Sequence, residues 1–147
     1  RVAGAGPDLA ALRSRALALG ADVEFLGYLT GGELVEAVHA ARATVVPSEC
    51  YENAPISILE SFALGKPVIG ARIGGIPELI DERATGWTFE SRAIDELAAV
   101  LGDVDALPER TLAGMGRSAR EIVERRFSEQ AYLQRLSEIY RRFSVAV

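Results

Sequence analysis

The sequence has few of the residues that build disulfides and metal sites. Its 147 residues include one cysteine, Cys50, and one histidine, His39. These counts exclude an intrachain disulfide, every cysteine-based zinc pattern and a histidine cluster. The scarcity of cysteine fits a reducing, cytoplasmic setting. Since no base is paired with Cys50, we expect it to be a small, partly buried side chain, and we assign no catalytic role to His39.

Long apolar runs and an excess of basic residues are also missing. No run approaches the about 18 apolar residues that a membrane-spanning helix needs. Lysine and arginine together number 16 against 21 aspartates and glutamates, which gives a net charge of −5. This balance argues against a nucleic acid or an anionic membrane as the main partner. With 49% hydrophobic residues, the composition is that of a soluble globular protein.

Short apolar runs alternate with helical patterns along most of the chain, which predicts a parallel α/β fold. The expected strands cover residues 1–3, 23–27, 43–47, 67–70 and 86–89. Beyond the last strand, helical spacing predicts three helices, over residues 91–101, 108–126 and 128–143. We therefore predict one α/β domain over residues 1–147, with a Rossmann-like parallel sheet, helices on both faces and a helical C-terminal tail.

Ligands bind such sheets beyond the carboxyl ends of the strands, so the residues after each strand are candidates. The third strand is followed by a helix predicted to begin at Pro55, with an alanine before it that is a poor N-cap. The amides of Ile56, Ser57 and Ile58 then lack a side-chain acceptor, and such a helix N-terminus favours an anion such as a diphosphate. The alternative is that water or Asn53 satisfies these amides. The segments selected in this way are 4–7, 27–29, 48–54 and 71–75.

Two carboxylates flank this helix start, Glu52 in the preceding loop and Glu60 inside the helix. Acids are repelled by a phosphate, but they accept hydrogen bonds from hydroxyl groups. One acid on each side of a diphosphate would thus hold a sugar at one end and a ribose at the other. The alternative is that Glu52 is solvated and Glu60 lies on an exposed face.

The segment from Glu52 to Glu60 resembles the Glu-x7-Glu motif of retaining glycosyltransferases with the GT-B fold, in particular family 4, the glycosyl transferases group 1. Members of this family transfer a sugar from a nucleotide diphosphate donor. Further segments resemble the family in order and approximate spacing, so that the resemblance covers about the whole chain. These segments are 4–7, 25–27, 46–48, 65–69, 74–80 and 85–86.

The resemblance implies roles for the matched residues. Glu52 would be the catalytic residue and bind hydroxyls of the donor sugar, Glu60 would bind the ribose hydroxyls, and the amides of Ile56 and Ser57 would contact the diphosphate. Many relatives carry Phe-Gly where this chain has Ala-Pro, and Pro55 has no N–H to offer. No metal or other cofactor is implied, since the nucleotide sugar is a substrate. The remaining donor-binding residues expected are Asn53, Gly4, Gly6, Gly27, Tyr28, Ser48, Gly74 and Gly75.

These remaining residues have separate expected tasks. Gly4 and Gly6 would let the backbone approach the nucleotide, and residues around Gly27 and Tyr28 would border the base. The turn at Gly74 and Gly75 would lie by the interdomain cleft, while Ser48 would serve in backbone capping or in a hydrogen bond to the ligand.

The resemblance also implies missing parts. In the family this domain begins with a strand and a loop bearing an Arg and a Lys, and neither has a counterpart before Arg1. The chain would thus be most of a donor-binding C-terminal domain, incomplete at its N-terminus, without its N-terminal acceptor domain and inactive alone. The full-length enzyme would act in the cytoplasm, including at the inner face of the membrane.

The absence of a first strand has a structural consequence. In a doubly wound sheet this strand lies between the second and the fourth, so its loss leaves a gap with exposed edges. We expect a rearranged sheet, self-association through the exposed edges, or marginal stability.

Other interpretations stay open. The chain could be a nucleotide- or phosphate-binding module without transfer activity, or an interaction domain that has kept the fold and lost the site. The Asp103-Val104-Asp105 segment resembles the metal-binding Asp-x-Asp of the other glycosyltransferase fold class, but it lies between two predicted helices, so we expect an exposed turn. The apolar stripe between Tyr132 and Phe143 is expected to be core, with part of it exposed if it packs toward a partner domain.

Overall fold

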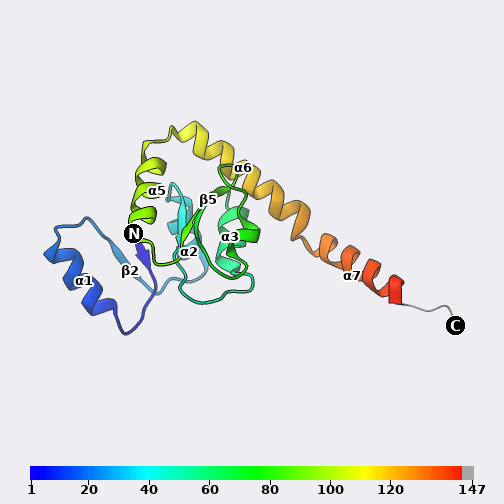
Figure 1. The fold of residues 1–147 in the computed structure, drawn as a ribbon, viewed down its shortest axis with the longest axis horizontal. Coiled ribbons are helices and arrows are strands. Elements are labelled where there is room, and N and C mark those ends of the chain that lie inside the picture. Colours follow the sequence, from blue (N-terminus) through cyan, green and yellow to red (C-terminus); the bar gives the residue numbers. More distant parts are fainter. Residues whose placement is uncertain (144–147) are drawn as a thin grey trace. The chain divides into compact units, whose positions relative to one another are not determined.

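A computed structural model describes residues 1–143 and confirms the predicted α/β class (Figure 1). Every pair of neighbouring strands in this part of the chain is parallel. In chain order the elements of the described residues are β1 (Val2–Ala3), α1 (Leu9–Ala18), β2 (Phe25–Gly27), α2 (Gly31–His39), β3 (Thr44–Val46), α3 (Ile56–Ala63), β4 (Val68–Arg72), α4 (Ile76–Leu79), β5 (Gly86–Glu90), α5 (Ile94–Ala106), α6 (Glu109–Arg126) and α7 (Glu129–Phe143).

The chain divides into two compact units, Arg1–Ala37 and a second unit that begins at Val38. In the first unit β1 pairs with β2, and α1 connects the two strands. None of the residues 1–37 is buried. The first unit therefore has no buried core of its own.

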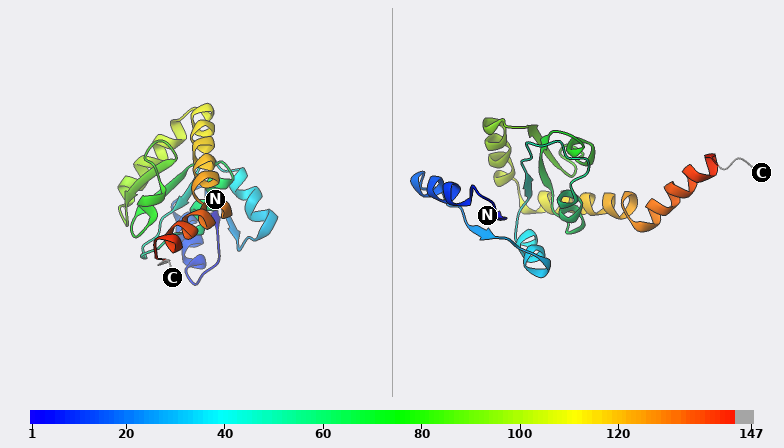
Figure 2. Two further views of the ribbon diagram at one scale, coloured as in Figure 1. Left: turned by 90° about the vertical axis from the view of Figure 1, so that its right-hand side faces the viewer. Right: turned by 90° about the horizontal axis from the view of Figure 1, so that it is seen from below.

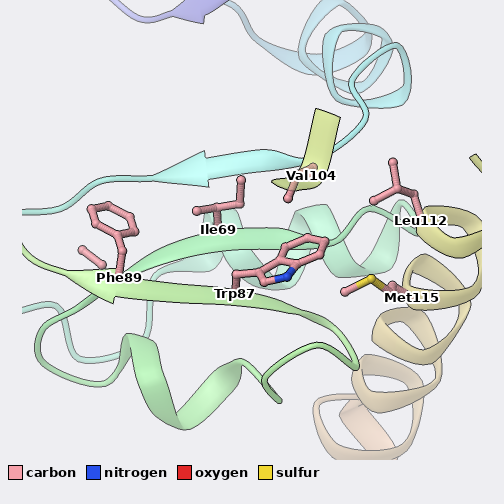
Figure 3. Close-up of a cluster of buried hydrophobic side chains, with 7 residues drawn as sticks. Ile69, Trp87, Phe89, Val104, Leu112 and Met115 are labelled. Carbon is pink, nitrogen blue, oxygen red and sulfur yellow. The ribbon is translucent and has the colours of Figure 1, made fainter. Parts of the chain in front are cut away.

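The second unit contains a three-stranded sheet in the order β3-β4-β5. Side chains of the central strand β4 alternate between its faces, so that Ile69 and Ala71 belong to one apolar cluster and Val68 to another. Figure 3 shows the first cluster, which brings side chains of β4 and β5 against α5 and the start of α6. Its buried members are Ile69, Ala71, Trp87, Phe89, Val104, Leu112 and Met115.

The second apolar cluster lies on the opposite face of this sheet, where α3 and α4 pack. Gly70 allows the close approach of α4, because a Cβ there would overlap side-chain atoms of Ile76 and Ile80. Helices thus cover both faces of the three-stranded sheet, as the sequence predicted. The buried members of this cluster are Ile58, Phe62, Val68, Ile76, Ile80 and Ala119.

Helix α6 contributes to both clusters. Leu112 and Met115 belong to the first, whereas Ala119, one turn further on, belongs to the second. Where α6 meets the end of α3, Gly116 lies so close to the carbonyl oxygen of Gly65 that a Cβ at position 116 would overlap it. The glycine is therefore what permits this helix contact.

The strands do not form one continuous sheet. Among the described residues β1 pairs with β2 alone, and β3 pairs with β4 alone. Each of the two strands keeps one edge that no described residue pairs with.

Two predictions for the C-terminal helices are wrong. Asp103 and Asp105 lie in the last turn of α5 and not in a loop, because Val104 between them is buried in the first cluster and extends the helix to Ala106. Helix α7 contains no buried residue, and Phe143 is 79% exposed. Helix α7 continues from the end of α6 (Figure 2) and has α6 as its main neighbour. With no buried residue, its apolar stripe is not core.

The single cysteine also differs from its prediction. Cys50 lies in the loop after β3, where its side chain is exposed and not partly buried. Across residues 1–143, no helix combines the length and the apolar composition needed to span a lipid bilayer.

Candidate functional site

The loop after β3 holds the predicted catalytic carboxylate, Glu52, by a direct side-chain contact. The hydroxyl Oγ of Ser48 donates a hydrogen bond to Oε1 of Glu52 over 2.5 Å. Both residues are half-buried. The second carboxylate oxygen, Oε2, has no hydrogen-bond partner within residues 1–143, so it remains available to accept a hydrogen bond.

The turn after β4 packs directly on this loop. Gly75 donates its amide hydrogen to the carbonyl oxygen of Glu52 over 2.7 Å. A Cβ at Gly74 would overlap the carbonyl oxygen of Glu52, and one at Gly75 would overlap that of Asn53. Gly74 also has a φ of 57°, in the left-handed region that favours glycine. The structure thus brings together five of the predicted site residues of the second unit, Ser48, Glu52, Asn53, Gly74 and Gly75.

Helix α3 begins immediately after this loop with free backbone donors. Its N-cap is Pro55, not the first helical residue as predicted, because Pro55 has an extended ψ of 116°. No side chain caps the helix, so the alternative in which Asn53 satisfies the amides is not observed. The amides of Ile56 and Ser57 have no acceptor among the described residues.

Two further predictions at this helix have different outcomes. The amide of Ile58 was expected to be free, but it donates to the carbonyl oxygen of Pro55 over 3.1 Å. This bond closes the first turn and leaves two free amides instead of three. Glu60 is exposed, and its carboxylate has no hydrogen bond or ion pair within residues 1–143. This is expected both of a residue that binds ribose hydroxyls and of a solvated surface residue.

The other predicted residues lie in the first unit, at the carboxyl ends of β1 and β2. Gly4 donates its amide hydrogen to the carbonyl oxygen of Gly27 over 2.6 Å, so these two positions are adjacent. A Cβ at Gly4, Gly6 or Gly27 would meet no heavy atom within 4 Å. Tyr28 follows with its side chain 77% exposed. The backbone of this region is therefore open to an approaching molecule.

The residues after β5 also contact the Glu52 loop, which the sequence did not indicate. Ser91 donates its hydroxyl hydrogen to the carbonyl oxygen of Ser48 over 3.0 Å. Arg92 forms an ion pair with Glu49, with 2.9 Å between Nε and Oε2. The rule that selected the other strand ends would have selected this one as well, but the residues carried no motif.

Arg72, at the end of β4, is occupied by carboxylates of its own surroundings. Its Nε lies 2.7 Å from Glu90 Oε1, and its Nη2 lies 2.8 Å from Glu96 Oε2. The hydrogen bond to Glu90 raises the pKa of the Arg72 guanidinium above its ordinary value, with the charge of Glu96 acting in the same direction. Arg72 is therefore engaged in ion pairs and does not leave a free cation after β4.

The described residues contain no group of three or more His, Cys, Asp or Glu side chains placed to hold a metal ion. The site geometry in the second unit thus consists of a half-buried carboxylate, two free helix amides and an exposed carboxylate further along the same helix. Such a set can accept hydrogen bonds from hydroxyls and donate hydrogen bonds to an anion.

Comparisons with known proteins give a family match over most of the chain. The family of glycosyl transferases group 1 matches residues 1–121. A D-inositol 3-phosphate glycosyltransferase of Saccharomonospora viridis is 35% identical over 132 residues, which cover 88% of this chain and 30% of that protein. The chain spans between 20% and 38% of the length of the curated relatives it matches.

Solved structures of low sequence identity share the fold. Anabaena Alr3699/HepE in complex with UDP superimposes with a TM-score of 0.81 at 23% identity, covering 94% of this chain and 39% of that one. The C-terminal domain of a glycosyl transferase group 1 family protein (LpcC) from Francisella tularensis has a TM-score of 0.68 at 20% identity, covering 84% of this chain and 66% of that one.

Proposed function

The chain belongs to the glycosyl transferases group 1 family, and we propose that it is the donor-binding portion of a longer enzyme that transfers a sugar from a nucleotide diphosphate sugar to an acceptor with retention of configuration. Since the chain spans about a third of the length of most of its curated relatives, the acceptor domain belongs to the remainder of that enzyme. We assign the enzyme to the cytoplasm, including the inner face of the membrane.

One observation carries the proposal beyond family membership. The half-buried carboxylate of Glu52 has one oxygen held by Ser48 and the other unpartnered among the described residues, directly before the uncapped start of α3. A carboxylate next to two free helix amides suits a ligand that presents hydroxyls beside a phosphate. A nucleotide sugar has this chemistry, because its sugar hydroxyls adjoin the diphosphate.

In the proposed mechanism the chain's own groups bind and orient the donor. The free oxygen of Glu52 accepts hydrogen bonds from sugar hydroxyls, and the amides of Ile56 and Ser57 donate to the diphosphate. Glu60 accepts from the ribose hydroxyls. The helix dipole favours the bound diphosphate by about 0.3–2 kcal/mol. Each hydrogen bond from a helix amide to the charged diphosphate adds about 1.5–3 kcal/mol. We propose that transfer proceeds without a metal ion, so that EDTA leaves the rate unchanged.

We propose donor-binding roles for the remaining family-matched residues as well. Asn53 directly follows Glu52 in the sequence. The backbone at Gly4 and Gly6 is accessible, so the nucleotide can approach it closely. Gly27 and the exposed Tyr28 border the base in this proposal.

Nucleotide binding and sugar transfer by the full-length enzyme test the proposal. Isothermal titration with UDP, GDP and ADP should reveal binding of at least one of them. Sugar transfer from the corresponding nucleotide sugar should then be detectable, and Glu52→Gln should lower turnover about a hundredfold while the affinity for the free nucleotide stays within about twofold.

The possible outcomes separate the competing interpretations. Binding without transfer by the full-length enzyme would indicate the non-catalytic nucleotide- or phosphate-binding module. If none of the three nucleotides binds, the chain would be an interaction domain that has lost the nucleotide-binding site. Inversion of configuration in the product would contradict the retaining mechanism while leaving the family intact.

A further inference from the structure

The loop after β5 touches the loop that carries Glu52 at two points. The hydroxyl of Ser91 donates to the backbone carbonyl oxygen of Ser48 over 3.0 Å, and Arg92 pairs with Glu49 over 2.9 Å. Ser48 in turn donates to the carboxylate of Glu52 over 2.5 Å. A chain of two hydrogen bonds therefore runs from Ser91 to the carboxylate.

The hydrogen bond from Ser91 holds the backbone of Ser48, and the hydrogen bond from Ser48 holds the side chain of Glu52. Ser91 and Ser48 are both half-buried and are 43 residues apart in the sequence, so their contact is a tertiary one. The direction of a serine hydroxyl depends on its backbone conformation together with one staggered χ1 angle. When the carbonyl group of Ser48 is held by Ser91, the Oγ of Ser48 is held in place for Glu52.

The turn that presents Ser91 is itself unusual. Arg92 has a φ of 69°, a left-handed conformation that costs a non-glycine residue about 1–2 kcal/mol. The amide of Ala93 closes the turn by donating to the carbonyl oxygen of Glu90 over 2.9 Å. Glycine would adopt this conformation without strain, but it would lack the guanidinium that reaches Glu49. The strained conformation of Arg92 is therefore consistent with a turn that holds the loop after β5 against the loop that carries Glu52.

We propose that Ser91 is a positioning residue for Glu52, acting through Ser48. The inference rests on the proposed function, because it assigns Ser91 to the orientation of the carboxylate that binds the donor sugar. It adds the loop after β5 to a site otherwise built from the loops after β3 and β4. Arg92 supports the same contact through Glu49.

The test compares Ser91→Ala with Ser91→Thr in the full-length enzyme. Loss of one hydrogen bond should lower kcat about threefold to tenfold in Ser91→Ala, with the KM for the nucleotide sugar changed less than about twofold. Threonine retains the hydroxyl, so Ser91→Thr should restore most of kcat. The affinity for the free nucleotide should be unchanged, because Ser91 forms no hydrogen bond with Ile56, Ser57 or Glu60, the residues proposed to bind the diphosphate and the ribose.

A matched control is Ser118→Ala, which also removes a hydroxyl that donates to a backbone carbonyl, that of Gly114 within α6. This variant should leave kcat unchanged. Equal kcat in Ser91→Ala and the wild type would overturn the inference. So would a fall in kcat that Ser91→Thr does not restore, or a fall of the same size in Ser118→Ala.

A second measurement does not depend on activity. Amide hydrogen exchange at Gly75, whose amide donates to the carbonyl oxygen of Glu52, should be faster in Ser91→Ala than in the wild type and in Ser118→Ala, because the loop that carries Glu52 loses a contact. Unchanged exchange at Gly75 would overturn the positioning role even in an active enzyme. A different outcome is faster exchange in Ser91→Ala together with no sugar transfer by the wild-type enzyme. This result would overturn the proposed function, and with it the role of Ser91 in transfer.

Discussion

The backbone amide of Gly75 donates a hydrogen bond to the carbonyl oxygen of Glu52 over 2.7 Å. This bond ties the turn after β4 to the loop that carries the predicted catalytic carboxylate. The contact requires glycine, because a Cβ at Gly75 would overlap the carbonyl oxygen of Asn53. The placement of Glu52 thus depends on backbone packing as well as on its own side chain.

Gly75→Ala should lower the free energy of unfolding by about 1–3 kcal/mol, because the added methyl group meets backbone atoms that cannot rotate away. Denaturation by urea, followed by the fluorescence of the buried Trp87, measures this change. Gly102→Ala is a suitable control, because a Cβ at Gly102 in α5 meets no heavy atom within 4 Å. The control should be more stable than the wild type by about 0.5–1 kcal/mol, and equal destabilisation of both variants would contradict the packing argument.

The same substitution at two positions of α6 should have opposite effects. Gly116→Ala places a methyl group against the carbonyl oxygen of Gly65 and should destabilise the protein by about 1–3 kcal/mol. Gly114→Ala meets only the flexible end of Arg117 at 3.7 Å and should stabilise it by about 0.5–1 kcal/mol. Thermal unfolding of both variants distinguishes close helix packing from helix propensity, which would predict stabilisation in both.

Glu60→Gln should weaken the binding of the free nucleotide about tenfold to a hundredfold, because the substitution removes the charge of the proposed acceptor of the ribose hydroxyls. Titration calorimetry on the full-length enzyme measures this change. Glu78, which is also an exposed glutamate, lies in α4 and provides the control: Glu78→Gln should bind like the wild type. Unchanged affinity in Glu60→Gln would show that Glu60 is a solvated surface residue.

The two units of the 147-residue chain should differ in local stability. None of the residues 1–37 is buried, whereas Val68 and Ile69 in β4 are almost fully buried. Opening of a segment with few buried apolar contacts costs little free energy. Amide hydrogen exchange should therefore be much faster at Gly4 than at Ile69. Comparable protection of the two amides would contradict this prediction.

The sequence predicted the elements well where the apolar pattern was continuous. The extent of α5 was wrong although its signal was present: Leu97, Val100 and Val104 repeat with helical spacing through the Asp-Val-Asp segment. Gly102 and the two aspartates favoured a turn locally, but burial of Val104 in the first apolar cluster outweighs that preference.

The candidate site was predictable in part. The strand-end rule located Ser48, Glu52, Gly74 and Gly75, because parallel strands place their carboxyl ends at one edge of a sheet. The contacts among them were not predictable, since they depend on loop conformation. The tie from Ser91 to the Ser48 carbonyl spans 43 residues and involves a backbone acceptor, which leaves no pattern of side chains in the sequence.

The course of α6 across both apolar clusters bears on the folding of the chain during its synthesis. Leu112 and Met115 close one face of the three-stranded sheet, and Ala119 closes the other. A nascent chain that ends before α6 has β3, β4 and β5, but it leaves Trp87 and Phe62, which belong to different clusters, only partly covered. We therefore expect this unit to complete its folding only after α6 has left the ribosome. Until then, apolar side chains on both faces of its sheet are partly exposed to water.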